Sequence, residues 1–203
     1  MRILNLILAA SMGFGSSAFA GPQSFDFKDP KGVNNVVFKT DAPLESINGT
    51  ANGISGAVSF DPADPGSVKG KIVVESASLR VPNDMMLGHL RSDKWLDVAQ
   101  YPQITFEALS ATNVKTTANV TTADVVGTMT LHGVSQKVTV PVKITYLKDK
   151  LKDRFPKLQG DLLVLRSTFI VKRSDYGINK GTGEDKVSDD IELNLSLAGQ
   201  SPH

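Results

Sequence analysis

Long stretches in which apolar and polar residues alternate constrain this chain more than any other feature. In residues 137–146, Val, Ile and Tyr occupy every second position, and Lys, Thr and Pro occupy the positions between them. The same period of two recurs over 103–108 and 190–197. Successive side chains of a strand point to opposite faces of its sheet, so each stretch would have one apolar and one solvated face. This pattern is typical of antiparallel β-sheets.

The chain carries about eight or nine such strands, separated by turn sequences such as "DPADPG" at 61–66 and "NKGTGED" at 179–185. Further strands are predicted over 36–40, 46–50, 54–60, 68–79, 124–131 and 160–171. Long strands with one apolar face favour a closed barrel or a sandwich. We favour an all-β antiparallel barrel of about eight strands, because "TMTLHGVSQKVTVPVKITY" indicates two long strands joined by a tight turn. Such a barrel is either filled by side chains or holds one small ligand.

Two segments interrupt the strand pattern. The first, "VPNDMMLGHLRSDKWL", predicts a short capping helix near 83–97, because Asn83 or Asp84 can cap its first turn. Met86, Leu87 and Leu90 would form the apolar stripe of this helix. The second is the Lys-rich segment 147–157, which would either touch an anionic membrane surface or a partner, or form a solvated extension between two strands.

The first twenty residues have the features of a secretory signal peptide. Arg2 precedes an apolar run over 3–14, and Ala18-Phe19-Ala20 has the small residues that signal peptidase recognises. We therefore expect cleavage after Ala20, a single domain over 21–203 and a periplasmic location. Because the chain contains no cysteine, its stability would depend on burial and hydrogen bonding without disulfides. Its 22 Lys and Arg residues balance 21 Asp and Glu residues, which leaves no basic field to bind nucleic acid.

The sequence contains no motif of a known catalytic or metal centre. It lacks a GxSxG elbow, a Walker loop, a dinucleotide fingerprint and an HExxH motif. His89 and Asp93 are four residues apart, but one histidine and one carboxylate are a poor transition-metal site. His132 precedes a glycine at a predicted hairpin turn, where it would bind a turn carbonyl. We therefore expect a protein that is not an enzyme and has no metal or cofactor.

Charged residues gather around the predicted helix and at the end of one strand. Arg91, Asp93 and Asp97 accompany the helix, and Arg173 and Asp175 follow the apolar stretch "LLVLRSTFIV". Two interpretations remain open. These charges could grip a polar head group at a barrel mouth while the apolar interior takes a tail. Alternatively, they could form an ion-pair network that ties the helix to the barrel.

Four segments resemble the YceI-like family and occur in that family's order. They are "GHLRSDKWLDVAQYPQITF", "VVGTMTLHGVSQKVTVPV", "FIVKRSDYGI" and "VSDDIELNLSL", and "GTANGISGAVSFDPADPG" is similar to earlier strands of the family. The resemblance extends over roughly 36–197. It implies a lipocalin-like barrel closed at one end by the helix that carries "HLRS". It also implies an elongated apolar cavity for a polyisoprenoid, an isoprenoid quinone or a similar lipid, and secretion to the periplasm.

The family motifs match this chain at particular residues. The His-Leu-Arg, aromatic and Tyr-Pro motif falls on His89, Leu90, Arg91, Trp95, Tyr101, Pro102 and Phe106. The Thr-Leu-His-Gly turn falls on 130–133, and the Arg-Ser-Asp-aromatic-Gly motif falls on 173–177. Two segments differ from the family pattern, namely "SFDFKDPKGVNNVVF" near the start and "LKDKLKDRFPKLQGD" before the strand of the Arg-Ser-Asp motif.

These observations predict a periplasmic binding or carrier protein for an amphipathic isoprenoid-type lipid. The head-group residues would be His89, Arg91, Arg173 and Asp175. The tail would contact Leu90, Trp95, Ile104, Phe106, Val138, Val140, Val142, Ile144, Ile191, Leu193 and Leu195. The alternative is a barrel with a filled core that acts as a periplasmic interaction or stress-response module. The volume inside the barrel distinguishes the two, and exposed strand edges or the Lys-rich segment could support a homodimer.

Overall fold

The computed structural model describes residues 21–203, so the predicted signal peptide lies outside the described residues. Two short α-helices are present in this part of the chain, α1 (Asp84–Arg91) and α2 (Leu151–Arg154). Short 3-10 turns form at η1 (Pro65–Ser67), η2 (Ser76–Ser78) and η3 (Arg173–Tyr176). The strands are β1 (Gln23–Asp26), β2 (Asn35–Asp41), β3 (Ser46–Ala51), β4 (Ile54–Phe60), β5 (Lys69–Glu75), β6 (Gln103–Thr117), β7 (Val120–Leu131), β8 (Val134–Leu147), β9 (Gly160–Lys172) and β10 (Asp190–Pro202).

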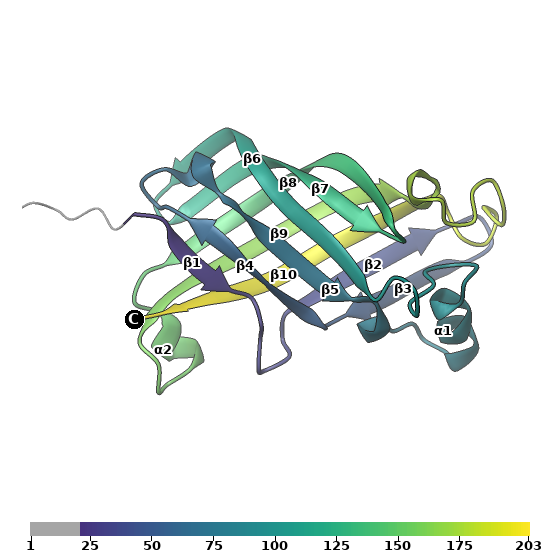
Figure 1. The fold of residues 1–203 in the computed structure, drawn as a ribbon, viewed down its shortest axis with the longest axis horizontal. Helices are drawn as coiled ribbons and strands as arrows, with labels where there is room; N and C mark the ends of the chain where they lie inside the picture. Colours follow the sequence, from purple (N-terminus) through teal and green to yellow (C-terminus); the bar gives the residue numbers. More distant parts are fainter. Residues whose placement is uncertain (1–20) are drawn as a thin grey trace, which may run out of the picture.

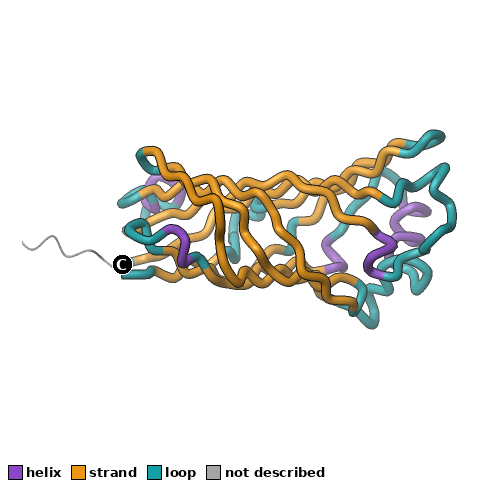
Figure 2. The backbone as a smooth tube through the Cα atoms, turned by 90° about the horizontal axis from the view of Figure 1, so that it is seen from above, coloured by secondary structure: helices purple, strands orange, loops and turns teal. Residues whose placement is uncertain are grey.

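The strands form an antiparallel barrel with eight positions around its axis. The sheet order is β1-β4-β5-β6-β7-β8-β9-β10-β2-β3, and pairing of β1 with β10 closes the ring. Both β1 and β2 pair with β10, at Gln200 and at Ile191–Ser196 respectively, so together they fill one position. β3 and β4 fill the next position in the same way. The predicted barrel of about eight strands is therefore confirmed (Figures 1 and 2).

The side chain of Asn34 bridges the gap between β1 and β2. Its Nδ2 donates to the carbonyls of Phe27 and Ala198 at 3.0 and 3.1 Å, and its Oδ1 accepts from the Ala198 amide at 2.8 Å. The side-chain amide thus replaces a peptide unit in the pairing with β10. Asn34 is buried, so these bonds satisfy backbone groups that water does not reach.

The β7–β8 hairpin has the tight turn that the sequence predicts. His132 and Gly133 connect the strands, and both have positive φ, at 51° and 73°. This combination belongs to two-residue turns whose twist matches that of the flanking strands. A Cβ at position 133 would also lie 2.5 Å from the ring of Tyr101, so only glycine fits there.

β8 and β9 pair over only part of their length. Their register runs from Lys143–Arg166 to Leu147–Leu162, whereas β7 and β8 pair along nearly their whole length. Pro141 lies two residues before Lys143 and has no N–H to donate, which is typical of a strand edge. The hydroxyl of Ser167 reaches across to the Pro141 carbonyl at 2.6 Å. The two strands therefore diverge toward the α1 end of the barrel.

Two predicted elements differ from the structure. The strand predicted over 68–79 ends at Glu75, because the Ser76 amide donates to the Pro102 carbonyl and its hydroxyl donates to the Tyr101 carbonyl. These bonds take the chain out of the sheet. The capping helix ends at Arg91, short of residue 97, although Asn83 caps it as predicted through a 2.8 Å bond from the Met86 amide.

The Lys-rich segment folds into α2 and is anchored to the barrel. Leu151 is completely buried, and Arg154 Nη2 lies 2.7 Å from Asp29 Oδ2. Desolvation raises the pKa of Asp29, but hydrogen bonds from the backbone amides of Asn34, Lys31 and Val33 and from Arg154 outweigh it and lower the pKa overall. None of the helices in residues 21–203 has both the length and the apolar character needed to cross a membrane.

Candidate functional site

The barrel interior is filled at the α2 end. Phe25, Phe60 and Tyr146 pack there, with Tyr146 ring centroids 6.3 and 6.2 Å from the two phenylalanines. Tyr146 donates to Asp161 Oδ2 at 2.7 Å, and desolvation together with this carboxylate raises the pKa of Tyr146 to about 12. None of these four side chains belongs to the lining of the apolar cavity at the other end of the barrel. We call this half of the barrel the closed end.

The other half, toward α1, is hollow. A cavity of about 730 Å³ extends from the α1 end down to Val58, Val68 and Ile144. This volume is in the range of pockets that hold one small molecule. The interior is therefore not filled throughout, and the predicted alternative of a filled core holds only for the closed end.

Three segments surround the mouth of the cavity. They are the β2–β3 turn with Glu45, helix α1 with Met85 and His89, and the loop that contains Gly183 and Lys186. The Leu44 amide donates to the Asp185 carbonyl at 2.9 Å and so connects the first segment to the third. Met85 is 76% exposed although it borders the cavity. The mouth thus presents an apolar side chain to solvent between charged neighbours.

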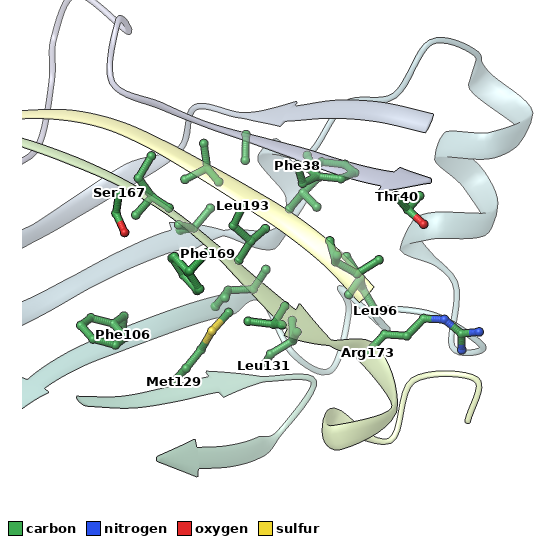
Figure 3. Close-up of a pocket in the computed structure, with 18 of the residues that line it drawn as sticks. Phe38, Thr40, Leu96, Phe106, Met129, Leu131, Ser167, Phe169, Arg173 and Leu193 are labelled. Atoms are coloured by element: carbon green, nitrogen blue, oxygen red, sulfur yellow. The ribbon is translucent and has the colours of Figure 1, made fainter. Parts of the chain in front are cut away.

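All of the predicted apolar residues except Val138 line this cavity. Val138 is half-buried and packs against buried apolar side chains of the barrel, but it is not part of the cavity lining. The members of the predicted set that do line it are Leu90, Trp95, Ile104, Phe106, Val140, Val142, Ile144, Ile191, Leu193 and Leu195. Other wall residues were not predicted from the sequence, including Phe38, Met129 and Phe169 (Figure 3). Phe38 could have been found, because Val36, Phe38 and Thr40 alternate with polar residues along β2.

Arg173 lies beside the cavity, but backbone carbonyls engage its guanidinium completely. Its Nε donates to Ser188, and its Nη1 donates to Ile178 and Asn179. Nη2 donates to the carbonyls of Thr182 and Val187 at 2.8 and 3.2 Å. An arginine has five N–H donors, so none remains for a head group. In Figure 3 the guanidinium lies beyond the apolar side chains of the wall.

These contacts organise the loop over 177–189, and Trp95 covers the guanidinium with its ring centroid 5.7 Å from Cζ. Asp189 completes the arrangement by accepting from the amide and the hydroxyl of Ser174, both at 2.9 Å. Burial raises the pKa of Asp189, but these bonds and the charges of Lys172 and Arg173 lower it overall. The Arg173 guanidinium therefore holds the loop over 177–189 in place at one side of the cavity mouth.

A comparison with protein-family models gives a match over most of the barrel. The model of the YceI-like domain matches residues 29–198. The chain belongs to the YceI-like family. It is similar to a UPF0312 protein of Pseudomonas aeruginosa, with 30% identity over 94% of this chain and 95% of the relative. Another UPF0312 protein, from Pseudomonas savastanoi pv. phaseolicola, is 33% identical over 75% of this chain and 73% of the relative.

Solved structures show the same fold at lower identity. Burkholderia cenocepacia BcnA superposes with a TM-score of 0.67 at 21% identity, covering 81% of this chain and 95% of that structure. A polyisoprenoid binding domain from Saccharophagus degradans, implicated in plant cell wall breakdown, gives a TM-score of 0.58 at 16% identity. That match covers 88% of this chain and 94% of the domain.

Two predicted head-group residues of this YceI-like protein lie away from the cavity. Arg91 does not line it, because its Nη2 donates to the carbonyls of Ala77 and Leu79 and ties α1 to η2. Asp175 is exposed on η3, where its backbone carbonyl accepts from Gln136. Only His89 and Arg173 of the predicted head-group set border the cavity. The predicted ion-pair network does not form at these residues, because among residues 21–203 no salt bridge includes Arg91, Arg173 or Asp175. Arg91 and Arg173 instead hold the helix and the loop in place through backbone carbonyls.

The motif residues of the YceI-like family at Tyr101 and His132 have structural contacts. Their ring centroids lie 4.9 Å apart in an edge-on arrangement, over the turn at Gly133. His132 Nδ1 lies 3.3 Å from the Tyr176 carbonyl, as expected for a histidine that binds a turn carbonyl. These contacts join the β7–β8 hairpin to η3 and to the segment after α1. Tyr101 and His132 therefore maintain the α1 end and are not part of the cavity lining.

The described residues contain one group with spacing suited to a metal ion. Ligand atoms of Asp149, Asp161 and His203 lie within 4.8 Å of one another, beside the closed end. Asp161 already accepts from the Tyr146 hydroxyl and from the Asp149 amide at 2.7 Å each. Its carboxylate thus has a structural role in holding the β8–β9 connection.

Proposed function

We propose that this YceI-like protein binds and carries one amphipathic isoprenoid-type lipid in the cavity at the α1 end, in the periplasm. The observation that carries the proposal is the apolar cavity of about 730 Å³ that opens at α1 and stops at the aromatic side chains of the closed end. Its elongated apolar wall suits a hydrocarbon chain. The similarity to a structure described as a polyisoprenoid binding domain supports this choice of ligand.

The binding free energy would come from burial of the chain. Each methylene that leaves water contributes about 0.8 kcal/mol, so a chain of about ten carbons gains several kcal/mol after ordering costs. We propose binding without turnover, because the rings of His89 and His132 have no hydrogen bond to a carboxylate or hydroxyl among residues 21–203. The periplasmic location rests on the predicted signal peptide. Contact with a membrane surface and formation of a homodimer remain predictions.

The test is native mass spectrometry of the purified protein, combined with analysis of its organic extract. We expect one lipid per chain, or uptake of one added isoprenoid alcohol. Leu193→Trp places a larger ring in the cavity and should abolish binding, whereas Asn194→Trp on the outer face of β10 should leave it unchanged. If the wild-type protein stays empty after addition of the isoprenoid, the proposed function is wrong.

A further inference from the structure

The two most exposed large apolar side chains among residues 21–203 lie at the same end of the barrel. Met85 of α1 is 76% exposed, and Leu44 of the β2–β3 turn is 66% exposed. Met85 also lines the cavity, and Leu44 precedes the lining residue Glu45. Figure 1 shows α1 and the end of β2 at one end of the barrel, opposite α2. Single apolar residues are common on protein surfaces, but two that flank the mouth of an apolar cavity indicate a contact surface.

Hydrogen bonds anchor the backbone that presents these two side chains. The Ala42 amide donates to the Glu45 carbonyl at 2.9 Å, which places Leu44 within a tight turn. The Leu44 amide donates to the Asp185 carbonyl, so this turn is fixed against the loop over 177–189. Met85 lies in the first turn of α1, which the Asn83 side chain caps. Both apolar side chains therefore extend into solvent from ordered positions.

The charges around the mouth do not favour an anionic partner. The segments 41–46, 84–91 and 179–187 surround it and contain Lys180, Lys186 and Arg91 as basic groups, to which His89 adds a charge when it is protonated. The same segments contain five carboxylates, namely Asp41, Glu45, Asp84, Glu184 and Asp185. The acidic groups outnumber the basic ones even when His89 is counted, so the mouth has no electrostatic attraction for an anionic surface.

The opposite end of the barrel has basic residues but no access to the cavity. The Lys-rich segment 147–157 contains four lysines and Arg154, yet none of its residues belongs to the cavity lining. The aromatic side chains of the closed end lie between this segment and the cavity. A lipid that leaves the cavity for water exposes its apolar chain, which costs free energy for every methylene. Direct contact between the mouth and a bilayer avoids this cost.

We infer that the α1 end of the barrel docks on a lipid bilayer, with Leu44 and Met85 inserted into the bilayer surface, and that the ligand passes directly between the bilayer and the cavity. This inference rests on the proposed function and adds the partner from which the lipid is taken. The contact is apolar, so neutral phospholipid is sufficient for it. Docking therefore occurs at the end opposite the Lys-rich segment.

The experiment measures the rate at which the chain over 21–203 takes up a dansyl-labelled isoprenoid alcohol from phosphatidylcholine vesicles. Trp95, the only tryptophan of the chain, borders the cavity and transfers its excitation energy to the bound dansyl group. The rate should rise with vesicle concentration, as expected for transfer by contact. Phosphatidylglycerol in the vesicles should not increase it, because the mouth carries more acidic than basic groups.

Leu44→Gln should slow the uptake from vesicles about tenfold, because burial of a leucine side chain contributes at least about this factor. The double variant Leu44→Gln, Met85→Gln should slow it further. Leu158→Gln is the matched control, since Leu158 is a leucine beside α2 that is 40% exposed, and it should leave the rate unchanged. All of these side chains are exposed, so the variants should melt at the temperature of the wild-type protein.

A second measurement adds the same alcohol without vesicles and separates docking from ligand binding. Leu44→Gln should bind the alcohol with the wild-type affinity, because Leu44 is not part of the cavity lining. Equal rates of uptake from vesicles for the wild-type protein and the double variant would overturn the inference. Uptake that requires phosphatidylglycerol and is lost in the variant Lys150→Gln, Lys152→Gln would overturn it as well. Absence of binding by the wild-type protein without vesicles would instead show that the proposed function is wrong.

Discussion

The two ends of this barrel are built from the same alternating strands, but side chains fill the interior at one end, and the other end contains a cavity. At the closed end, aromatic side chains from β1, β4 and β8 meet across the axis and leave no space. At the α1 end, aliphatic side chains together with Phe38, Phe106 and Phe169 surround an open cavity, and hydrogen bonds hold the surrounding loops. Core packing thus fills one half, whereas the other half combines a second buried cluster, which includes Leu96, Met129 and Tyr176, with hydrogen bonds around the rim. This division lets the protein keep a cavity without losing its fold.

Matched truncations at the two ends should give the largest contrast in stability. Phe27 is completely buried at the closed end, whereas Phe38 borders the cavity. Phe27→Ala should lower the free energy of unfolding by about 3–5 kcal/mol, since it leaves a hole in a filled core. Phe38→Ala should cost about 1–2 kcal/mol, because the removed atoms already border a void and lose fewer contacts. Urea denaturation measures both, and equal losses would argue against a hollow α1 end.

The side chain of Arg173, with its hydrogen bonds to backbone carbonyls, should stabilise the α1 end more than any other single side chain. Arg173→Met would leave carbonyls of the loop over 177–189 without their donors, and we expect a loss of about 3 kcal/mol. Arg91→Met removes fewer bonds and should cost about 1 kcal/mol. Hydrogen exchange should show the loosening in the loop over 177–189 for Arg173→Met. Exchange that spreads equally to β1 and β4 would indicate that the two ends are not independent.

Asn34 joins the split strand near the closed end and should have an intermediate effect. Asn34→Ala leaves the Ala198 amide and carbonyl unpaired, at a cost of about 1–3 kcal/mol. Asn35→Ala is the matched control, because the Asn35 side chain makes only an exposed contact with the Val33 carbonyl, and it should change stability by less than about 0.5 kcal/mol. Thermal denaturation compares the pair. A similar small shift in melting temperature for both variants would show that the Asn34 side chain is not needed in the pairing with β10.

Acid should lower the stability of the folded protein at both ends of the barrel, because each end contains one carboxylate with a lowered pKa. The pKa values of Asp29 and Asp189 are lowered in the folded protein, so each adds stability above its unfolded value near 3.8 and loses it as the pH falls through the folded value. Asp29→Asn and Asp189→Asn should each flatten the loss of stability below about pH 4. The effect should be larger for Asp29, whose side chain is 3% exposed against 24% for Asp189. Denaturation curves between pH 3 and 7 test this order.

The barrel and its capping helix could be predicted from the sequence, because both depend on local patterns of residues. Alternation along 137–146 places Val140, Val142 and Ile144 on the inner face, and the structure puts all three at the cavity. Phe25 and Phe27 alternate with Ser24, Asp26 and Lys28 in the same way, but the sequence analysis did not assign this short segment as a strand. Its pairing with β4 is recognisable only in the folded sheet.

The roles of the charged residues could not be predicted because their partners are backbone groups. Arg173 binds carbonyls of residues 178–188, whose positions depend on the folded loop and not on their side chains. A pattern of residue types identifies an inward position, but only the structure shows whether the polar atom there is satisfied.

A crystal structure of the protein soaked with an isoprenoid alcohol that carries bromine at the end of its tail tests the central claim most directly. We expect one anomalous peak inside the barrel near Val142 and Ile144, with density that leads back toward the mouth at α1. The closed end around Phe25 and Phe60 should hold no ligand density. A bromine peak only on the outer surface of the sheet, or an interior closed by rearranged side chains, would contradict it.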